Sequence, residues 1–104
     1  MYVSYRWLQE YFDAPLPSPE TLAELFTAHL FEVEAVVAKG NDCIFDCKVL
    51  PDRAHYLLSH EGVATEVGVL TGLVRKVAPS VDAPAATGGV PVSIQNDQLC
   101  RRYL

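Results

Sequence analysis

The chain has few of the residues that define several large protein classes. Its 104 residues include three cysteines, one methionine and one tryptophan. A small, odd number of cysteines does not suit a disulfide-rich secreted scaffold. No apolar run approaches the roughly 20 residues of a membrane helix, and no basic-then-apolar signal opens the chain. We therefore expect a cytoplasmic protein without membrane association.

Two of the cysteines, Cys43 and Cys47, lie four apart in a segment with strand-like alternation. This spacing places both side chains on one face of a strand, about 13 Å apart, which is too far for a disulfide. Free thiols are therefore expected, as in a reducing cytosol.

Basic residues are scarce as well, with 8 Lys and Arg against 13 Asp and Glu and a net charge of −5. Residues 1–72 carry four basic and eleven acidic side chains, a balance of −7, whereas residues 73–104 carry four and two, a balance of +2. Nucleic-acid binding relies on clustered Lys and Arg against phosphates. The acidic body therefore predicts weak nucleic-acid binding or none.

Half of the residues are hydrophobic and 20% are charged, which is ordinary for a globular protein. A chain of this length buries roughly 65% of its unfolded surface, enough for one core. We expect one domain, or one domain and the edge of another.

Three helices are predicted by their start and stop signals. Ser4, Ser18 and Ser59 are each placed as an N-cap before apolar residues at helical spacing. Pro19 at a first helical position strengthens the second start, and Gly72 ends the third helix. The expected apolar stripes are Trp7, Leu8, Tyr11 and Phe12, then Leu22, Leu25, Phe26, His29 and Leu30, and finally Val63, Val67 and Leu70.

Between the second and third helices the apolar period changes to two, which predicts a β-hairpin with one buried face. Residues 39–42 form the turn, and Pro51 ends the second strand. The alternating residues are Val33, Ala35 and Val37 in the first strand and Cys43, Phe45, Cys47 and Val49 in the second. We expect residues 1–78 to form the body, residues 79–89 a linker, and residues 90–104 to begin with a strand over about 90–95.

The turn of Pro51, Asp52 and Arg53 is the first motif with two interpretations. It is either a functional contact or a rigid turn, and the rigid turn is favoured. In that interpretation Asp52 accepts backbone N–H groups and Arg53 pairs with an acid such as Asp46.

Other chemistry-bearing residues have no suitable spacing. Ser59, His60 and Glu61 have the residue types of a nucleophilic site, but neighbours on a helix do not face each other. Capping or packing is therefore expected for Ser59 and His60. The remaining candidates are a metal set (His29, His55, His60, Cys43 and Cys47), an acid pair (Glu32 and Glu34) and a phosphate loop (Gly88-Gly89). None has the required pattern, so no catalytic, cofactor-binding or metal residue is predicted.

Aromatic residues are dense near the N-terminus, and core packing is their favoured role. A partner surface or a base-stacking platform is the alternative. The residues are Tyr2, Tyr5, Trp7, Tyr11 and Phe12.

Four separated segments resemble one family in the right order. They are Val3-Ser4-Tyr5-Arg6-Trp7-Leu8-Gln9-Glu10-Tyr11, Phe31-Glu32-Val33-Glu34, the stretch from Val49 to Ala64 with its Pro-Asp-Arg and Leu-Ser-His motifs, and Leu99-Cys100-Arg101-Arg102-Tyr103. They are similar to the start of the bacterial phenylalanine–tRNA ligase β chain.

The resemblance implies an α2β2 enzyme that attaches phenylalanine to its tRNA with ATP and Mg²⁺, with the catalytic centre on the α chain. The β chain is a string of modules that includes an editing module. This chain resembles the first module, an α+β, helix-rich fold related to winged-helix-like DNA-binding domains, and runs into the first editing strand at residues 90–94. The partners implied are the rest of the β chain, the α chain and, for the whole enzyme, tRNA.

The chain departs from the family pattern at three places. The family's inserted OB-fold tRNA-binding domain is absent between Lys39 and Asp42. The usual Cys-Pro-Arg-Tyr reads Cys-Arg-Arg-Tyr at residues 100–103, and Tyr56 stands where an Asp or Asn often follows the turn. Because the chain stops shortly after residue 103, we expect a fragment of a longer protein.

The sequence therefore predicts a non-catalytic scaffold module that binds neither ATP nor Mg²⁺ and is inactive alone. Two alternatives remain. One is a stand-alone winged-helix-like nucleic-acid binder, which would need a basic stripe on a helix. The other is a small protein–protein adaptor that uses the N-terminal aromatic residues.

Overall fold

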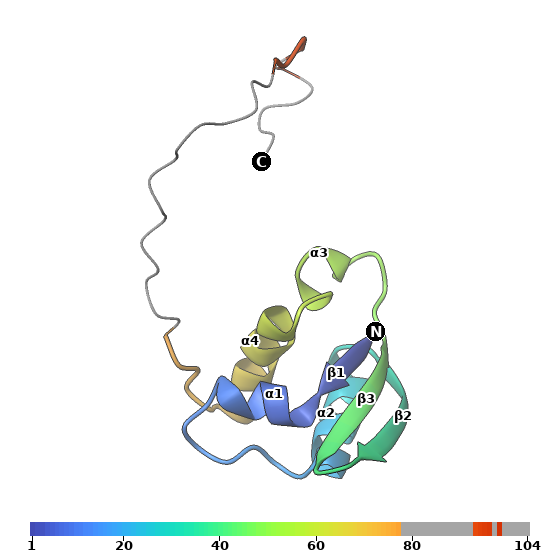
Figure 1. The fold of residues 1–104 in the computed structure, drawn as a ribbon, viewed down its shortest axis with the longest axis vertical. Helices are drawn as coiled ribbons and strands as arrows, with labels where there is room; N and C mark the ends of the chain where they lie inside the picture. Colours follow the sequence, from blue (N-terminus) through green and yellow to red (C-terminus); the bar gives the residue numbers. More distant parts are fainter. Residues whose placement is uncertain (78–92, 97, 99–104) are drawn as a thin grey trace.

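A computed structural model of the chain describes residues 1–77, 93–96 and 98 (Figure 1). Within these residues it contains four helices and a three-stranded antiparallel sheet, so the expected α+β class is confirmed. The elements are β1 (Tyr2–Ser4), α1 (Tyr5–Glu10), α2 (Pro19–His29), β2 (Glu32–Lys39), β3 (Asp42–Lys48), α3 (Ala54–Leu57) and α4 (His60–Thr71).

The predicted hairpin is confirmed as β2 and β3, joined at Gly40 and Asn41. Gly40 has a φ of 64°, which glycine adopts without a steric penalty. The sheet has the order β1-β3-β2, and its third strand, β1, was not expected. Three residues are too short for a periodic signal, and β1 forms only because β3 offers a free edge about 40 residues later in the chain. This pairing makes β3 the central strand.

An irregularity in β2 changes the register of the hairpin. Val33 lies opposite Cys47, but Ala35 lies opposite Asp46, the adjacent residue of β3. Glu34 is therefore the extra residue of a β-bulge. Because side chains alternate along a strand, one extra residue moves every later side chain of β2 to the other face.

The expectation that Val33, Ala35 and Val37 share a buried face is therefore wrong. After the bulge Val36 lies opposite Phe45, which faces the helices, and Val37 lies opposite Ile44 on the other face. The Val37 side chain is 55% exposed. The central strand follows its predicted pattern, since Phe45 and Cys47 are buried.

The three predicted helix starts are confirmed. Ser4, Ser18 and Ser59 each accept a hydrogen bond through the side-chain oxygen from the backbone N–H three residues later. Gly72 ends α4 in the left-handed conformation with a φ of 72°. The buried stripe predicted for α2 is confirmed at Leu22 and Phe26. It is wrong at His29, which is exposed in the last turn of the helix.

The core lies between the helices and one face of the sheet. Phe45 is at its centre and meets the ring of Phe26 edge-on, with 5.6 Å between centroids. The hydrophobic core consists of Val3, Leu8, Phe12, Leu16, Leu22, Phe26, Phe31, Phe45, Cys47, Leu57, Val63, Ala64 and Val67. All of these residues lie within the predicted body.

The chain after α4 returns across the end of α1 (Figure 1). The Lys76 N–H donates to the Tyr11 carbonyl at 2.8 Å, and the backbones of Arg75 and Phe12 pair in an isolated antiparallel β-bridge. The short helix α3 was not expected, because four residues give no periodic signal. In the part of the chain described, no helix has the length and apolar character needed to cross a membrane.

Two expectations concern the C-terminal region. The predicted linker, 79–89, lies outside the described residues. Of the strand expected over about 90–95, the structure describes residues 93–95, which are not in a strand.

We predict that Val63→Asp unfolds the domain, because Val63 is fully buried on α4. An unpaired carboxylate there costs several kcal/mol, comparable to the whole stability of a small domain. Val69→Asp is the matched control, since Val69 is 73% exposed on the same helix. Circular dichroism should show a cooperative thermal transition for the control and none for Val63→Asp. Equal melting temperatures would contradict the assigned core.

Candidate functional site

The Pro51-Asp52-Arg53 motif is an exposed turn between β3 and α3. The Arg53 N–H closes it by donating to the Leu50 carbonyl at 3.3 Å. The turn is therefore held by backbone atoms, and the expected acceptor role of Asp52 is wrong, because none of the described N–H groups donates to its carboxylate.

The expected pairing of Arg53 with Asp46 is also wrong. Asp46 lies 3.9 Å from the amino group of Met1, because β1 runs beside β3 and brings the N-terminus to this carboxylate. Arg53 instead lies near the Tyr56 hydroxyl, where its charge acts on the pKa of that phenol.

Ser59 joins α3 to α4 through two hydrogen bonds. Its Oγ donates to the Tyr56 carbonyl at 2.9 Å and accepts the Gly62 N–H at 3.0 Å. These bonds hold the Tyr56 carbonyl so close to Gly62 that a Cβ there would overlap it. The first turn of α4 therefore requires glycine at position 62.

Tyr56 adds a second connection between the two helices. Its hydroxyl donates to a carboxylate oxygen of Glu66 at 2.9 Å, and this hydrogen bond is the main reason why the pKa of Tyr56 is raised. The tyrosine, which departs from the family pattern at this position, thus has a structural partner within α4.

His60 connects the start of α4 to the N-terminal strand. Its Nε2 accepts the Ser4 N–H at 3.0 Å, and its ring stacks on Trp7 with 4.0 Å between centroids. Burial lowers the pKa of His60, and the nearby Asp42 carboxylate opposes this shift. The neutral imidazole is therefore the form that suits the fold, since a protonated Nε2 could not accept the Ser4 N–H.

Asp42 completes this junction at the start of β3. Its carboxylate accepts hydrogen bonds from the Ser4 hydroxyl at 2.6 Å, the Arg6 N–H at 2.9 Å and the Cys43 N–H at 2.8 Å. Burial raises the pKa of Asp42, but these hydrogen bonds outweigh burial and leave the pKa below its usual value. The junction is thus a structural network in which each polar group already has a partner.

The residue types of a nucleophilic site are not assembled at Ser59, His60 and Glu61. The Ser59 hydroxyl faces the Tyr56 carbonyl, whereas the acceptor nitrogen of His60 is bonded to β1. Glu61 is exposed and lies 3.4 Å from Arg75. The three side chains therefore act separately, as expected from adjacent positions on a helix.

The metal candidates are also separated. In the described residues, no group of three His, Cys, Asp or Glu side chains is placed to hold a metal ion. Cys43 and Cys47 are free thiols on β3, as predicted. Burial raises the pKa of Cys47 to about 12, which keeps this thiol protonated and unreactive at neutral pH. Glu32 and Glu34 are both exposed, as expected.

The N-terminal aromatic residues divide between core and surface. Phe12 is buried, and Tyr5 and Tyr11 pack against the core, which confirms the favoured interpretation for these three. Tyr2 and Trp7 are 71% and 52% exposed, so core packing is wrong for them, and a partner surface or base-stacking platform stays a prediction. Tyr2 is the one that lies on the sheet.

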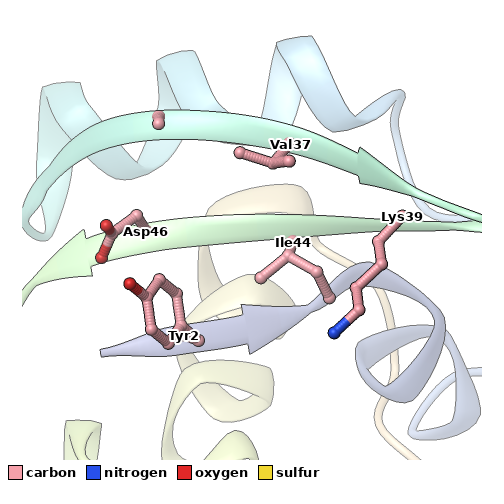
Figure 2. A pocket seen from close by; sticks show the side chains of 6 residues that line it. Tyr2, Val37, Lys39, Ile44 and Asp46 are labelled. Atoms are coloured by element: carbon pink, nitrogen blue, oxygen red, sulfur yellow. The ribbon is translucent and has the colours of Figure 1, made fainter.

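The outer face of the sheet, which no described helix covers, is the best candidate for a functional surface (Figure 2). It holds an open hollow of about 400 Å³, with Asp46 and Tyr2 at one end and Lys39 at the other. Its lining is mostly apolar and consists of Tyr2, Ala35, Val37, Lys39, Ile44 and Asp46. An apolar surface with separated charges suits binding and not acid–base catalysis.

Sequence reasoning missed this outer face. The extra residue Glu34 turns Ala35 and Val37 outward, and the unpredicted strand β1 places Tyr2 on the same face, across the central strand β3. A signal was present in the adjacent pair Val36-Val37, because two consecutive apolar residues in a strand place one on each face.

Comparisons with known proteins support a relationship to one enzyme subunit. The chain is 42% identical over 65 residues to a phenylalanine–tRNA ligase beta subunit of Chromobacterium violaceum and 50% identical over 40 residues to that of Bacillus licheniformis. The matches cover 62% and 38% of this chain but 8% and 5% of the relatives, so the chain spans less than a tenth of their length. No protein-family model and no solved structure match the chain.

These matches confirm, over part of the chain, the resemblance found in the motifs. The winged-helix-like architecture has no matching solved structure and stays a prediction.

We predict that His60 makes stability depend on pH. Its pKa is lower in the folded protein than in the unfolded chain, so the unfolded state binds more protons between the two values. The contribution of His60 to stability is complete above the pKa of the unfolded state, about 6.5, and is lost as pH falls through the pKa of the folded state. His60→Gln keeps a hydrogen-bond acceptor but does not titrate. Urea unfolding from pH 8 to 5 should show a smaller loss of stability in this variant, and identical slopes would contradict the assignment.

We also predict that Gly62→Ala destabilises the protein. Helix propensity alone would favour alanine by about 1 kcal/mol. The overlap with the Tyr56 carbonyl forces a backbone shift of the kind that costs about 1–3 kcal/mol or more. The two effects have opposite signs, so the direction of the change in melting temperature decides between them. A higher melting temperature would show that α3 and α4 do not approach as described.

Proposed function

We propose that this chain is a non-catalytic, N-terminal scaffold module of a phenylalanine–tRNA ligase β subunit. The observation that carries the proposal is the 42% identity over 65 residues to a β subunit of this enzyme. The geometry is consistent with a scaffold, since the polar residues of the conspicuous motifs already bond to one another within the fold.

In this proposal the outer face of the sheet is where the module meets the rest of the ligase. An apolar surface that includes Tyr2 and Val37 is stabilised when a neighbouring domain covers it. The matched relatives are more than ten times longer than the segment that aligns, so they contain other domains that could do so. The proposed partners are the rest of the β chain and the α chain of an α2β2 enzyme in the cytoplasm.

ATP, Mg²⁺ and phenylalanine would bind elsewhere in that enzyme. Among the described residues, the Cys47 thiol is buried and protonated, and the Ser59 hydroxyl is already hydrogen-bonded. Direct tRNA binding by this chain would be weak, because residues 1–72 have a charge balance of −7. The direct turn at Gly40 and Asn41 is consistent with a form that lacks the OB-fold insert.

A stand-alone winged-helix-like nucleic-acid binder is the weaker proposal. The sheet order, with two helices between β1 and β2, suits that architecture. However, α2 presents the exposed acids Glu20 and Glu24, and a helix that enters a nucleic-acid groove needs basic residues.

We predict that the full chain co-purifies with phenylalanine–tRNA ligase chains when it is tagged and expressed in its source organism. Val37→Asp should reduce the amount recovered about tenfold, because it places a charge on the apolar outer face. Val69→Asp is the control, since Val69 is exposed on α4, away from the sheet. The purified chain alone should give no phenylalanine-dependent ATP–pyrophosphate exchange. Exchange above background, or no ligase chains in the eluate, would overturn the proposal.

A further inference from the structure

The free edge of β2 is a second surface that no strand of the described residues covers. β2 has eight residues and lies at the border of the sheet, with β3 on one side only. An edge strand presents unpaired N–H and C=O groups, and proteins usually keep such edges short or covered. Among the described residues, only the Thr27 side chain reaches this edge, where it accepts the Val33 N–H at 3.3 Å.

A groove follows this edge on its helical side. It lies between α2 and β2, and its volume is about 540 Å³. The floor is apolar, and the only charged side chains in the lining are Glu24 on α2 and Glu34 on β2. The remaining lining residues are Ala23, Thr27, Ala28, Val33, Ala35 and Val36.

Ala35 lines both this groove and the outer hollow of the sheet. A strand added beside β2 would therefore have the groove on its helical side and, on its other side, the β2 part of the outer hollow, formed by Ala35 and Val37. Beyond the bulge, the pairing of β2 with β3 is regular from Ala35 to Lys39, which leaves an uninterrupted segment for a new strand. Both features are requirements for peptide binding by strand addition, in which backbone bonds give affinity and alternate pockets give specificity.

The charges at the edge indicate the chemistry of the added strand. At the Ala35 end of the segment, Glu24 and Glu34 are exposed and neither has an ion-pair partner within the described chain, whereas the exposed Lys39 lies at its other end. Glu32, at the start of β2, is paired with Lys48 at 3.6 Å. A second copy of this chain would bring another acidic body, with a balance of −7 over residues 1–72, and this net charge favours a basic segment over a second copy.

We propose that the free edge of β2 and its groove form a docking site for an extended polypeptide segment with alternating apolar residues and flanking Lys or Arg. The segment adds as a fourth strand beside residues 35–39. Its apolar side chains enter the groove and the outer hollow, and its basic side chains lie against Glu24 and Glu34. The site extends beyond the proposed ligase role and does not depend on it.

The probe for this proposal is a fluorescein-labelled octapeptide, Lys-Val-Thr-Val-Lys-Ile-Thr-Lys, titrated with the full chain in an anisotropy assay. We expect saturable binding with a dissociation constant below about 1 mM. Glu24→Lys together with Glu34→Lys should weaken binding about tenfold or more. The matched control is Glu10→Lys with Asp13→Lys, which makes the same charge change on exposed residues near the end of α1. This control should leave the dissociation constant unchanged within about twofold.

Two further peptides separate strand addition from simple charge attraction. The same peptide with N-methylated backbone amides on alternate residues should lose binding, because one edge of it can no longer donate hydrogen bonds. A peptide with Glu in place of Lys should also bind at least tenfold more weakly. Amide NMR signals of residues 35–39 should shift most when the original peptide is added.

Several results would overturn the proposal. These are equal binding of the methylated peptide, equal weakening by the control variant, shifts centred outside β2, or no saturation at 1 mM. A mass twice that of the chain in sedimentation, with the shifts of residues 35–39 already present without peptide, would show a second copy at the edge and would also overturn it. Melting curves of the variants confirm that each remains folded.

Discussion

The β-bulge at Glu34 decides which side chains the sheet presents to solvent. Without the extra residue, Ala35 and Val37 would face the helices with Val33. With it, Val36 takes the inward position opposite Phe45, and Val37 joins Ile44 and Tyr2 on the outer face. One residue thus decides that Ala35 and Val37, and not Val36, lie on the outer face of the sheet.

The bulge is tolerated because the central strand is fixed independently of β2. Phe45 is fully buried against Phe26, and β1 pairs with β3 from its other side. The N-terminus of β1 is in turn held at Cys47, whose carbonyl accepts a hydrogen bond from the amino group of Met1 at 2.6 Å. The edge strand can therefore carry an irregularity without loss of the core.

A junction of hydrogen-bonded polar residues fixes the positions of α1 and α4 relative to this sheet. Ser4 lies at its centre: its hydroxyl donates to Asp42 and accepts from Trp7, while its N–H donates to His60. The strand β1, the hairpin and α4 therefore meet at one residue. The Ser59 hydroxyl and Nε2 of His60 are likewise hydrogen-bonded to backbone groups, which explains why the serine and histidine of the suggestive motif are structural.

Local signals were sufficient for the capped helices α1, α2 and α4 and for the hairpin, and insufficient for the short helix α3 and for the third strand of the sheet. Ser18 and Gly72 were found because capping depends on residues within one helical turn. The strand β1 and the partner of Asp46 depend on contacts across more than 40 residues, which no local pattern encodes. The outer face was missed for a different reason: strict period-two alternation does not locate an inserted residue such as Glu34, and the adjacent pair Val36-Val37 was its only local sign.

The central claim is that the bulge turns Val37 away from the core. Nuclear Overhauser contacts from the Val37 methyl groups test it directly, because these contacts report which side chains lie close together in solution. The structure predicts contacts with the Ile44 side chain across the outer face and none with the ring of Phe45. Strong contacts between Val37 and Phe45 or Phe26 would show that β2 runs without a bulge and would contradict the account.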